Sequence, residues 1–184
     1  MQPEFTPFPK IARWSRTVLV TEKIDGTNAQ IWISDDGTQL LAGSRNKWIT
    51  PESDNYGFAR WVQENAEELL KLGPGSHFGE WWGAGIQRRY GLTEKRFSLF
   101  NVSRWGDEAV RPKCCHVVPV LYSGPMDDFF PEDVIARLDK YGSHAAPGFM
   151  APEGIVIFHT ASGQLFKKTV TKDESPKGLA AAAP

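Results

Sequence analysis

The stretch E-K-I-D-G-T-N, residues 22–28, decides how the rest of the chain can fold around it. The β-branched and apolar residues T-V-L-V-T-E (17–22) predict a strand that runs into Lys23, and A-Q-I-W-I (29–33) predicts a second one. Gly26 lies between them and predicts a turn. Because side chains alternate along a strand, Lys23 and Asp25 are expected on one face, an amine beside a carboxylate at a strand end. Taken alone, such a short pattern favours a surface ion pair at a hairpin.

Turns and periodic apolar residues extend this start into a mixed structure. D-D-G (35–37) marks a turn before a third strand at 40–42, so an antiparallel meander is expected. Apolar residues recur at helical spacing from Phe58 to Leu70, and G-P-G (73–75) ends that helix. Further strands are expected at residues 77–81, 97–102, 116–122, 154–159 and 164–170.

A second helix is expected to begin near Pro131, with Val134, Ile135, Leu138 and Tyr141 along one face. The fold class is therefore α+β, with antiparallel sheets flanked by helices. One domain is expected over residues 1–174, and residues 175–184 are expected to form a disordered tail because they have too little to bury.

Composition limits the classes of protein that fit. The 184 residues have a formal net charge of −1, and 41% of them are hydrophobic, as in ordinary globular proteins. The field of the whole chain will not hold a nucleic acid, so any such contact must come from local clusters. The candidate clusters are Arg88-Arg89, Lys95-Arg96 and Lys167-Lys168, each of which alone favours a solvated face.

Compartment and metal binding can be judged from a few residues. Cys114 and Cys115 are adjacent, so an ordinary disulfide between them is not expected, and no Cys/His spacing suits zinc. The first residues lack the features of a signal peptide, and no apolar run approaches the length of a membrane span. The expectation is a cytoplasmic protein with reduced thiols and no membrane contact.

Six stretches, taken in order, resemble the signatures of the covalent nucleotidyltransferases, the superfamily of DNA ligases, RNA ligases and mRNA capping enzymes. Together they cover roughly residues 21–171, and any one of them alone is a weak signal. The six are E-K-I-D-G-T-N (22–28), A-G-S-R (42–45), F-G-E-W-W-G (78–83), S-L-F-N-V (98–102), P-E-G-I-V (152–156) and L-F-K-K (165–168).

Within the superfamily, the chain most resembles the nick-sealing RNA ligase 2 family, because G-A-G-I-Q (83–87) follows the third signature. The resemblance implies an adenylation domain that uses ATP with Mg²⁺, or Mn²⁺, to form lysyl-AMP. It also implies that the AMP is used to join 3′-hydroxyl and 5′-phosphate ends of RNA or of a nicked duplex, with DNA as the other substrate to consider. A monomer is expected, acting in the cytoplasm, or in that of a host if a phage encodes it.

The resemblance assigns the catalytic residues. Lys23 would attack the α-phosphate of ATP. An amine must lose its charge to be a nucleophile, and cationic neighbours such as Lys167, Lys168 and a metal disfavour that charge. Arg45 would contact phosphate, because the donors of its planar guanidinium group match the geometry of phosphate oxygens.

The resemblance also assigns binding residues. Glu153 would bind Mg²⁺, which carboxylates and phosphate oxygens usually hold, although a turn residue is the plain alternative. Phe100 would stack on adenine, although a core phenylalanine fits the segment taken alone. Polynucleotide contacts are implied for Gln87, Arg88 and Arg89. The implied nucleotide pocket comprises Glu22, Ile24, Asp25, Gly26, Asn28, Glu80 and Phe100.

The chain departs from the superfamily pattern in two places. The last signature usually carries lysines two apart, whereas Lys167 and Lys168 are adjacent and Thr169 takes the second place, so Lys168 should face the other way unless a bulge re-aims it. The sequence also shows no second domain after this strand. Self-adenylylation should tolerate that better than sealing, for which an accessory protein could supply the missing part.

Two rival interpretations remain open. A minimal ATP-dependent DNA ligase would use the same chemistry, and only G-I-Q (85–87) favours RNA; capping by GTP transfer fits less well. A degenerate module that binds a nucleotide or RNA without catalysis is disfavoured, because Lys23, Glu153 and Lys167 are all present.

Overall fold

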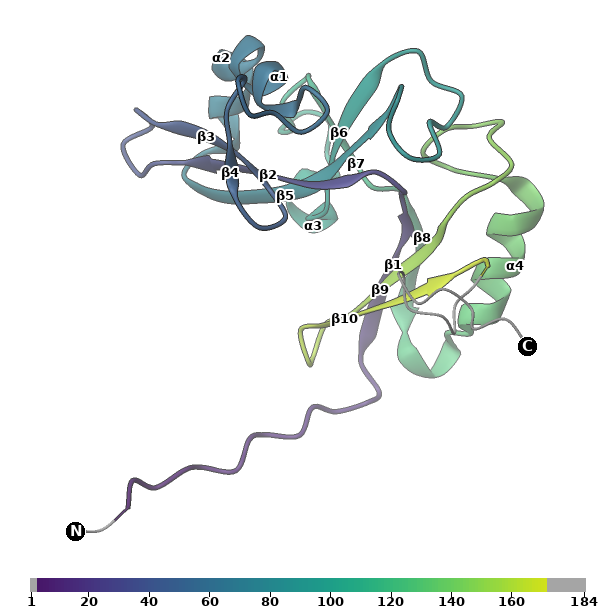
Figure 1. Cartoon of the computed structure of the whole chain (residues 1–184). Helices are drawn as coiled ribbons and strands as arrows, with labels where there is room; N and C mark the ends of the chain where they lie inside the picture. Colours follow the sequence, from purple (N-terminus) through teal and green to yellow (C-terminus); the bar gives the residue numbers. More distant parts are fainter. Residues whose placement is uncertain (1–2, 172–184) are drawn as a thin grey trace, which may run out of the picture.

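The computed structural model describes residues 3–171, which fold into two β-sheets with helices packed against them (Figure 1). The strands of the larger sheet are β2 (Thr27–Ile33), β3 (Leu40–Ser44), β4 (Trp48–Ile49), β5 (Gly75–Gly83), β6 (Lys95–Leu99) and β7 (Cys115–Val117). Those of the smaller sheet are β1 (Thr17–Lys23), β8 (Val120–Pro125), β9 (Gly154–His159) and β10 (Gln164–Thr169). The helices are α1 (Phe58–Glu64), α2 (Ala66–Leu69), α3 (Val102–Trp105) and α4 (Pro131–Tyr141), with short 3₁₀ turns η1 (Leu70–Leu72) and η2 (Met126–Asp128).

The two sheets are assembled mainly from antiparallel neighbours. The larger sheet has the strand order β4-β3-β2-β5-β6-β7 and the smaller one β10-β9-β1-β8. Among these neighbours only β6 and β7 run parallel. The predicted α+β class, with antiparallel sheets flanked by helices, is confirmed.

Each sheet buries one face under its own helices. The larger sheet packs against α1, α2 and η1, and in its core the Phe58 ring contacts the rings of Trp81 and Phe97. The smaller sheet packs against α4, where Val134 and Leu138 meet apolar side chains of β1 and β9. Pro131 at the first helical position suits the start of α4, because that position needs no backbone N–H. The two sheets therefore have separate cores.

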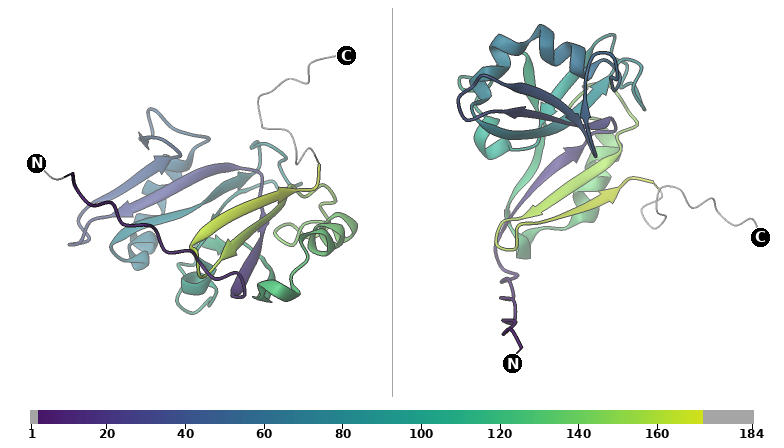
Figure 2. Two further views of the ribbon diagram at one scale, coloured as in Figure 1. Left: turned by 90° about the horizontal axis from the view of Figure 1, so that it is seen from below. Right: turned by 60° about the vertical axis from the view of Figure 1, so that its left-hand side comes forward.

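The chain crosses from the smaller to the larger sheet between Lys23 and Thr27 (Figures 1 and 2). Gly26 is required in this crossing, because a Cβ atom there would lie 2.4 Å from the Trp81 carbonyl oxygen. A third apolar cluster fills the junction, and its buried members are Ile24, Trp82, Tyr90, Val118 and Ala146.

This crossing corrects the predicted meander. β2 pairs with β3 and β5, whereas β1 pairs with β8 and β9, so the first two strands belong to different sheets. The backbone of β1 forms its hydrogen bonds with β8 and β9, which lie about a hundred or more residues later in the chain. A local sequence pattern cannot specify such distant partners.

Two predicted strands and the apolar faces of two predicted helices are also corrected. The strand predicted at 97–102 ends at Leu99. The strand predicted at 116–122 divides into β7 and β8, which lie in different sheets on either side of Pro119. The predicted helical faces are too wide, since Leu70 is 41% exposed and Tyr141 is 63% exposed. The predicted tail at 175–184 lies outside the described residues.

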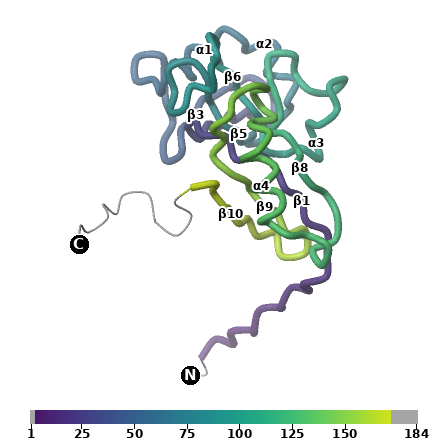
Figure 3. Tube along the Cα trace, turned by 90° about the vertical axis from the view of Figure 1, so that its right-hand side faces the viewer, coloured from purple at the N-terminus to yellow at the C-terminus, as the bar shows by residue number. Residues whose placement is uncertain are grey.

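Residues 3–16 form an extended arm that leaves the body beside the smaller sheet (Figures 1 and 3). Its side chains are exposed along its whole described length. Within residues 3–171 both cysteines are free, and no helix is long and apolar enough to cross a membrane.

Candidate functional site

The structure places Lys23 and Glu153 side by side at the junction of the two sheets. Lys23 is the last residue of β1, and its strand partner is Gly154, the first residue of β9. Glu153, the residue before β9, therefore lies beside Lys23, and its Oε2 atom is 2.7 Å from the Lys23 Nζ atom. The Glu153 side chain is 3% exposed and the Lys23 side chain 22% exposed, so the lysine is partly open to solvent while its partner is buried.

Gly154 makes this approach of strands possible. Gly154 of β9 pairs with Lys23 of β1 on one side and with Thr169 of β10 on the other. A Cβ atom on Gly154 would lie 2.2 Å from the Lys168 carbonyl oxygen, so a larger residue would push β10 away. The glycine after Glu153 is therefore a requirement of the backbone as well as a part of the sequence motif.

Glu80 reaches the site from β5 in the larger sheet. Its carboxylate accepts hydrogen bonds from the Gly26 backbone N–H (3.0 Å) and from the Asn28 side-chain amide (3.2 Å). Burial raises the pKa of Glu80 to about 7, and the Lys23 charge and the Gly26 N–H oppose that rise. The negative charges of Glu153 and Asp25 raise the same pKa further, so the three carboxylates share one region.

Asp25 is fixed by the loop that follows β5. Its backbone N–H donates to the Tyr90 hydroxyl (2.7 Å), and its carboxylate accepts from Arg88 Nε (3.0 Å). Arg88 also donates through Nη1 to the carbonyl oxygens of Ala151 (2.9 Å) and Pro152 (3.4 Å). One guanidinium thus joins the segment after Lys23 to the segment before Glu153.

The loop that carries Arg88 has an unusual backbone. Gln87, Arg89 and Tyr90 all have positive φ angles of 44° to 60°, a region that side chains other than glycine seldom adopt. Gln87 and Arg89 are exposed, as polynucleotide contacts would need to be. Arg88 instead has internal partners, a role that the sequence did not suggest, and its contact with a polynucleotide stays a prediction.

Glu22 points away from Lys23, as neighbours on a strand must. It is 1% exposed, and it accepts hydrogen bonds from the Ser143 hydroxyl (2.5 Å) and from the backbone N–H groups of His144 (2.8 Å) and Ala145 (2.9 Å). These contacts anchor β1 to the turn after α4. No local pattern predicted this contact, and Glu22 supports the site from the face of β1 opposite to Lys23.

Phe100 lies just beyond β6, where its backbone N–H donates to the Phe78 carbonyl (3.0 Å) and continues the β5–β6 pairing. Strand alternation from Ser98, which pairs with Glu80, puts Phe100 on the Glu80 side of the sheet. Its side chain is 42% exposed, whereas Leu99 is 1% exposed and belongs to the opposite core. Phe100 is therefore an available stacking surface, and Leu99 is the core residue of the pair.

The two lysines of β10 face opposite ways. Lys167 shares the face of Thr169 and hence that of Lys23, from which it is separated by the intervening strand β9. Lys168 lies on the α4 side, where its Nζ atom is 3.4 Å from a carboxylate oxygen of Glu132. Only Lys167 is thus available to a ligand that contacts Lys23, and Lys168 is turned away as strand alternation predicted.

Two predicted residues have other placements. Arg45 follows β3 in an exposed turn, and no hydrogen bond or ion pair within residues 3–171 joins it to the lysine or the carboxylates of the site. Ile24 is 3% exposed in the junction core, so its side chain supports the pocket from inside the protein.

A divalent cation fits the carboxylates only if a substrate supplies further ligands. No group of three or more His, Cys, Asp or Glu side chains among residues 3–171 could hold a metal by itself. Glu153 is buried at the lysine, and Glu80 lies in the same electrostatic neighbourhood. Mg²⁺ is commonly held by one or two carboxylates together with phosphate oxygens and water, which matches this donor set.

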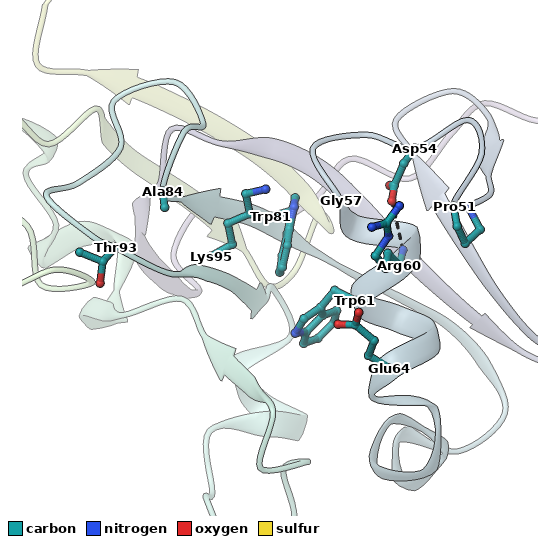
Figure 4. Close-up of a pocket in the computed structure, with 10 residues that line it drawn as sticks. All are labelled: Pro51, Asp54, Gly57, Arg60, Trp61, Glu64, Trp81, Ala84, Thr93 and Lys95. Carbon is teal, nitrogen blue, oxygen red and sulfur yellow. Dashed lines mark hydrogen bonds between the residues drawn. The ribbon is translucent and has the colours of Figure 1, made fainter.

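A separate cavity of about 610 Å³ lies on the other face of the larger sheet (Figure 4). Trp61, Trp81 and Lys95 line it between α1 and the ends of β5 and β6. Trp81 and Glu80 are neighbours on one strand and so face opposite sides. This cavity is therefore not part of the site at Lys23.

The arrangement offers one solvent-accessible amine, buried carboxylates beside it, a lysine on the same sheet face and an exposed aromatic ring. Such a set suits the transfer of a phosphorus group to nitrogen, because an amine is a nucleophile once deprotonated. It also suits binding of a base, a ribose and a metal-bound phosphate.

Comparison with known proteins gives a family match. The family model described as RNA ligase matches residues 16–170, which are 155 of the 184 residues. A search of curated protein sequences gave no match.

Solved structures of Naegleria gruberi RNA ligase share the fold. An alanine variant with ATP and Mn matches with a TM-score of 0.62 at 19% identity, over 86% of this chain and 51% of that chain. A methionine variant with AMP and Mn gives 0.59 at 20%, over 85% and 50%, and the protein with PPi gives 0.59 at 22%, over 84% and 50%. The chain thus spans about half the length of these structures.

Proposed function

Because this chain belongs to the RNA ligase family, we propose that it is an ATP-dependent RNA ligase that forms lysyl-AMP on Lys23. The observation that carries the proposal is the 2.7 Å approach of the Lys23 amine to the buried Glu153 carboxylate, at the junction of the two sheets. The Naegleria gruberi RNA ligase structures with ATP, with AMP and with PPi support the choice of ATP as the AMP donor. Residues 1–174 would be the adenylylation domain.

In the first step the Lys23 nitrogen attacks the α-phosphorus of ATP. A phosphorus–nitrogen bond forms, the bond between the α-phosphorus and the bridging oxygen breaks, and pyrophosphate leaves. Two protons leave the nitrogen, one before attack and one as the phosphoramide forms. The Glu153 carboxylate lies within hydrogen-bonding distance of this nitrogen and is placed to receive a proton.

The nucleotide would lie against residues from both sheets. Phe100 offers an exposed ring for stacking on adenine. Glu80 can accept hydrogen bonds from ribose hydroxyls while it holds Gly26 and Asn28 in place. Lys167 shares the sheet face of Lys23 and would neutralise charge on the phosphates.

A divalent cation, Mg²⁺ or Mn²⁺, would be held by Glu153, with Glu80 nearby. Bound there, it would neutralise negative charge on the phosphate oxygens. The protein's own part is to hold these carboxylates in place, which Arg88 does through the carbonyl oxygens just before Glu153.

Two further transfers would complete ligation. An oxygen of a 5′-phosphate end attacks the lysyl-AMP phosphorus, the phosphorus–nitrogen bond breaks, and Lys23 leaves as an amine that takes up a proton. A 3′-hydroxyl then attacks the 5′-phosphorus, loses its proton and releases AMP. Arg45, Gln87 and Arg89 are exposed and would contact the polynucleotide phosphates during these steps.

The first test is direct. The protein is incubated with ATP labelled at the α-phosphorus and Mg²⁺, then denatured and separated. Acid-labile label should remain on the wild type and on Lys140→Ala, whose lysine lies on the exposed side of α4, and should vanish in Lys23→Ala. A wild type that never takes up label between neutral and alkaline pH would support a nucleotide-binding module without catalysis.

A second test ranks the substrates. Nicked duplexes that carry RNA or DNA on the 3′-hydroxyl side are offered to the adenylylated protein, and sealed product is measured. Faster sealing of the RNA junction is expected. Equal rates on both would leave the DNA ligase interpretation standing. The same assay, repeated with a host extract, would show whether an accessory protein is needed for sealing.

A further inference from the structure

The extended arm of residues 3–16 has a repeat of three residues. Phe5, Phe8, Ile11 and Trp14 are each three apart, and they are 86%, 82%, 84% and 65% exposed. Large apolar side chains so far from any core are unusual, and in a regular series they mark an interaction surface. The series ends where the arm joins β1.

A basic series follows the same spacing. Lys10, Arg13 and Arg16 are also three apart, each one position before or two positions after an apolar member. Proline-rich extended chains favour the polyproline II helix, with three residues per turn and a rise of about 3.1 Å per residue. In that conformation the apolar and the basic residues form two adjacent edges, with successive cations about 9 Å apart. Pro3, Pro7 and Pro9 supply the proline.

The three basic residues of this series border a groove against the body of the protein. A cavity of about 540 Å³ lies between the arm and the turn that joins β9 to β10. Three cations line it, and the rest of its lining is uncharged: Lys10, Ile11, Ala12, Arg13, Arg16, Ala161, Ser162 and Gln164. None of the three cations forms an ion pair with another residue between 3 and 171. The groove therefore suits an anion.

The root of the arm is fixed, so the groove is part of the fold. The Trp14 carbonyl accepts a hydrogen bond from His159 Nε2 (3.0 Å), and the Arg16 carbonyl accepts one from the Met126 N–H (2.8 Å). At the start of β1, the Thr17 carbonyl accepts from both the N–H and the hydroxyl of Thr160. The last residues of the arm are thereby held against the β9–β10 turn.

We propose that this groove and the arm bind single-stranded RNA, with Lys10, Arg13 and Arg16 on the phosphates and the apolar edge against the bases. The choice of RNA rests on the proposed function. Cations alternating with aromatic rings are what sequence-tolerant binding of a single strand requires, since every base can stack on an aromatic ring. Within residues 3–171, the lining of the groove holds three cations and no acidic side chain. A protein partner would gain less binding energy from such a groove, because charged residues are depleted at the centre of protein interfaces.

The groove lies at the far end of β1 from the amine that would carry AMP. Seven residues of strand place Thr17 about 20 Å from Lys23, which is about the length of six stacked nucleotides. The arm would thus hold the substrate strand several nucleotides from its reacting end, and a shorter strand would not reach both places.

The test is RNA binding by the full chain in which Lys10, Arg13 and Arg16 are all replaced by alanine. The control replaces three exposed cations elsewhere, Lys113, Arg137 and Lys140, and so removes the same charge. Binding of a fluorescein-labelled 20-nucleotide single-stranded RNA is measured by anisotropy over a range of salt concentrations. Loss of up to three phosphate contacts should weaken binding about tenfold or more at 0.1 M salt and lower the salt slope by about 2.

The strand-length test uses a five-nucleotide RNA, which is too short to contact the arm and the site at Lys23 together, so the wild type is expected to bind it more weakly than the 20-nucleotide RNA. Replacing Phe8 and Trp14 with serine should also weaken binding of the long RNA while leaving the salt slope unchanged, because it removes stacking and no charge.

Several outcomes would overturn the proposal. These are an arm variant that binds the long RNA as the wild type does, an equal loss in the control variant, or a wild-type dimer that the arm variant converts to monomer. Because the assay needs neither ATP nor catalysis, it can fail while lysyl-AMP still forms. Equally, the absence of lysyl-AMP would contradict the proposed function without changing the RNA-binding result.

Discussion

The amine of Lys23 and the carboxylate of Glu153 lie 2.7 Å apart although 130 residues separate them in the chain. The contact is possible because β1 ends where β9 begins, so that Lys23 pairs with Gly154 across the sheet. The two partners differ in burial, at 22% and 3% exposure, and this difference has consequences for stability.

Lys23→Ala should destabilise the fold more than Glu153→Gln. Removing the lysine takes its charge away from a buried carboxylate, whereas removing the carboxylate leaves a lysine that can turn toward water. Breaking a fully buried pair costs about 3–5 kcal/mol, and the exposure of Lys23 reduces this to about 2 kcal/mol for Lys23→Ala. Urea denaturation at neutral pH measures both variants. A larger loss in Glu153→Gln would contradict the argument.

Arg88→Ala should slow lysyl-AMP formation about tenfold to a hundredfold, because small misplacements of reacting groups have effects of that size. The guanidinium joins Asp25 to the carbonyls of Ala151 and Pro152, and so it sets the approach of Lys23 to Glu153. The rate of label uptake from ATP is compared with that of Arg137→Ala, which removes an exposed arginine of α4. Arg88→Lys, which cannot make all three contacts, should recover only part of the rate. Equal rates in Arg88→Ala and Arg137→Ala would count against a positioning role.

The buried carboxylate of Glu80 should lower the free energy of unfolding as the pH rises. Burial raises its folded-state pKa from 4.5 to about 7, so the folded protein holds a proton that the unfolded chain releases. The stabilisation is fully present below about pH 4.5 and is lost as the pH rises toward about 7, with a total of about 3 kcal/mol. Glu80→Gln should remove this dependence.

The measurement is the difference in free energy of unfolding between wild type and Glu80→Gln at about pH 5 and pH 8. The difference should move in favour of the variant at the higher pH. His77 and His116, whose pKa values burial lowers, contribute in the opposite direction, but their contributions cancel between the two proteins. A constant difference across this range would rule out a raised pKa for Glu80.

Gly154→Ala should detach β10 from the smaller sheet. The added Cβ would lie 2.2 Å from the Lys168 carbonyl and 2.7 Å from the Thr169 Cα atom, and backbone atoms cannot give way as side chains can. Overpacking of this kind costs about 1–3 kcal/mol, and here it also displaces Lys167. Hydrogen exchange should show faster exchange in β10 than in β2 and β5 of the same variant. Uniform protection of both sheets would show that the strand tolerates the methyl group.

The sequence by itself determined the local structure near the site. The β-branched and apolar residues of 17–22 and the pattern of 29–33 predicted two strands that the structure contains. Strand alternation also predicted that Lys168 faces away from Lys23. The six ordered signatures predicted a family that the match over residues 16–170 supports. These features depend only on the spacing of residue types over a few positions, and that spacing can be read from the sequence without the tertiary structure.

Only the tertiary structure decided which sheet each strand joins and which groups meet. β1 and β2 are neighbours in sequence but lie in different sheets, because hydrogen-bonding partners are chosen by the whole fold. For the same reason Glu22 is held by Ser143, and Arg88 is bound to Asp25 and to the carbonyls before Glu153. A polar side chain is satisfied by whatever donors and acceptors the packed chain brings to it, and those come from segments whose distance along the sequence carries no local signal.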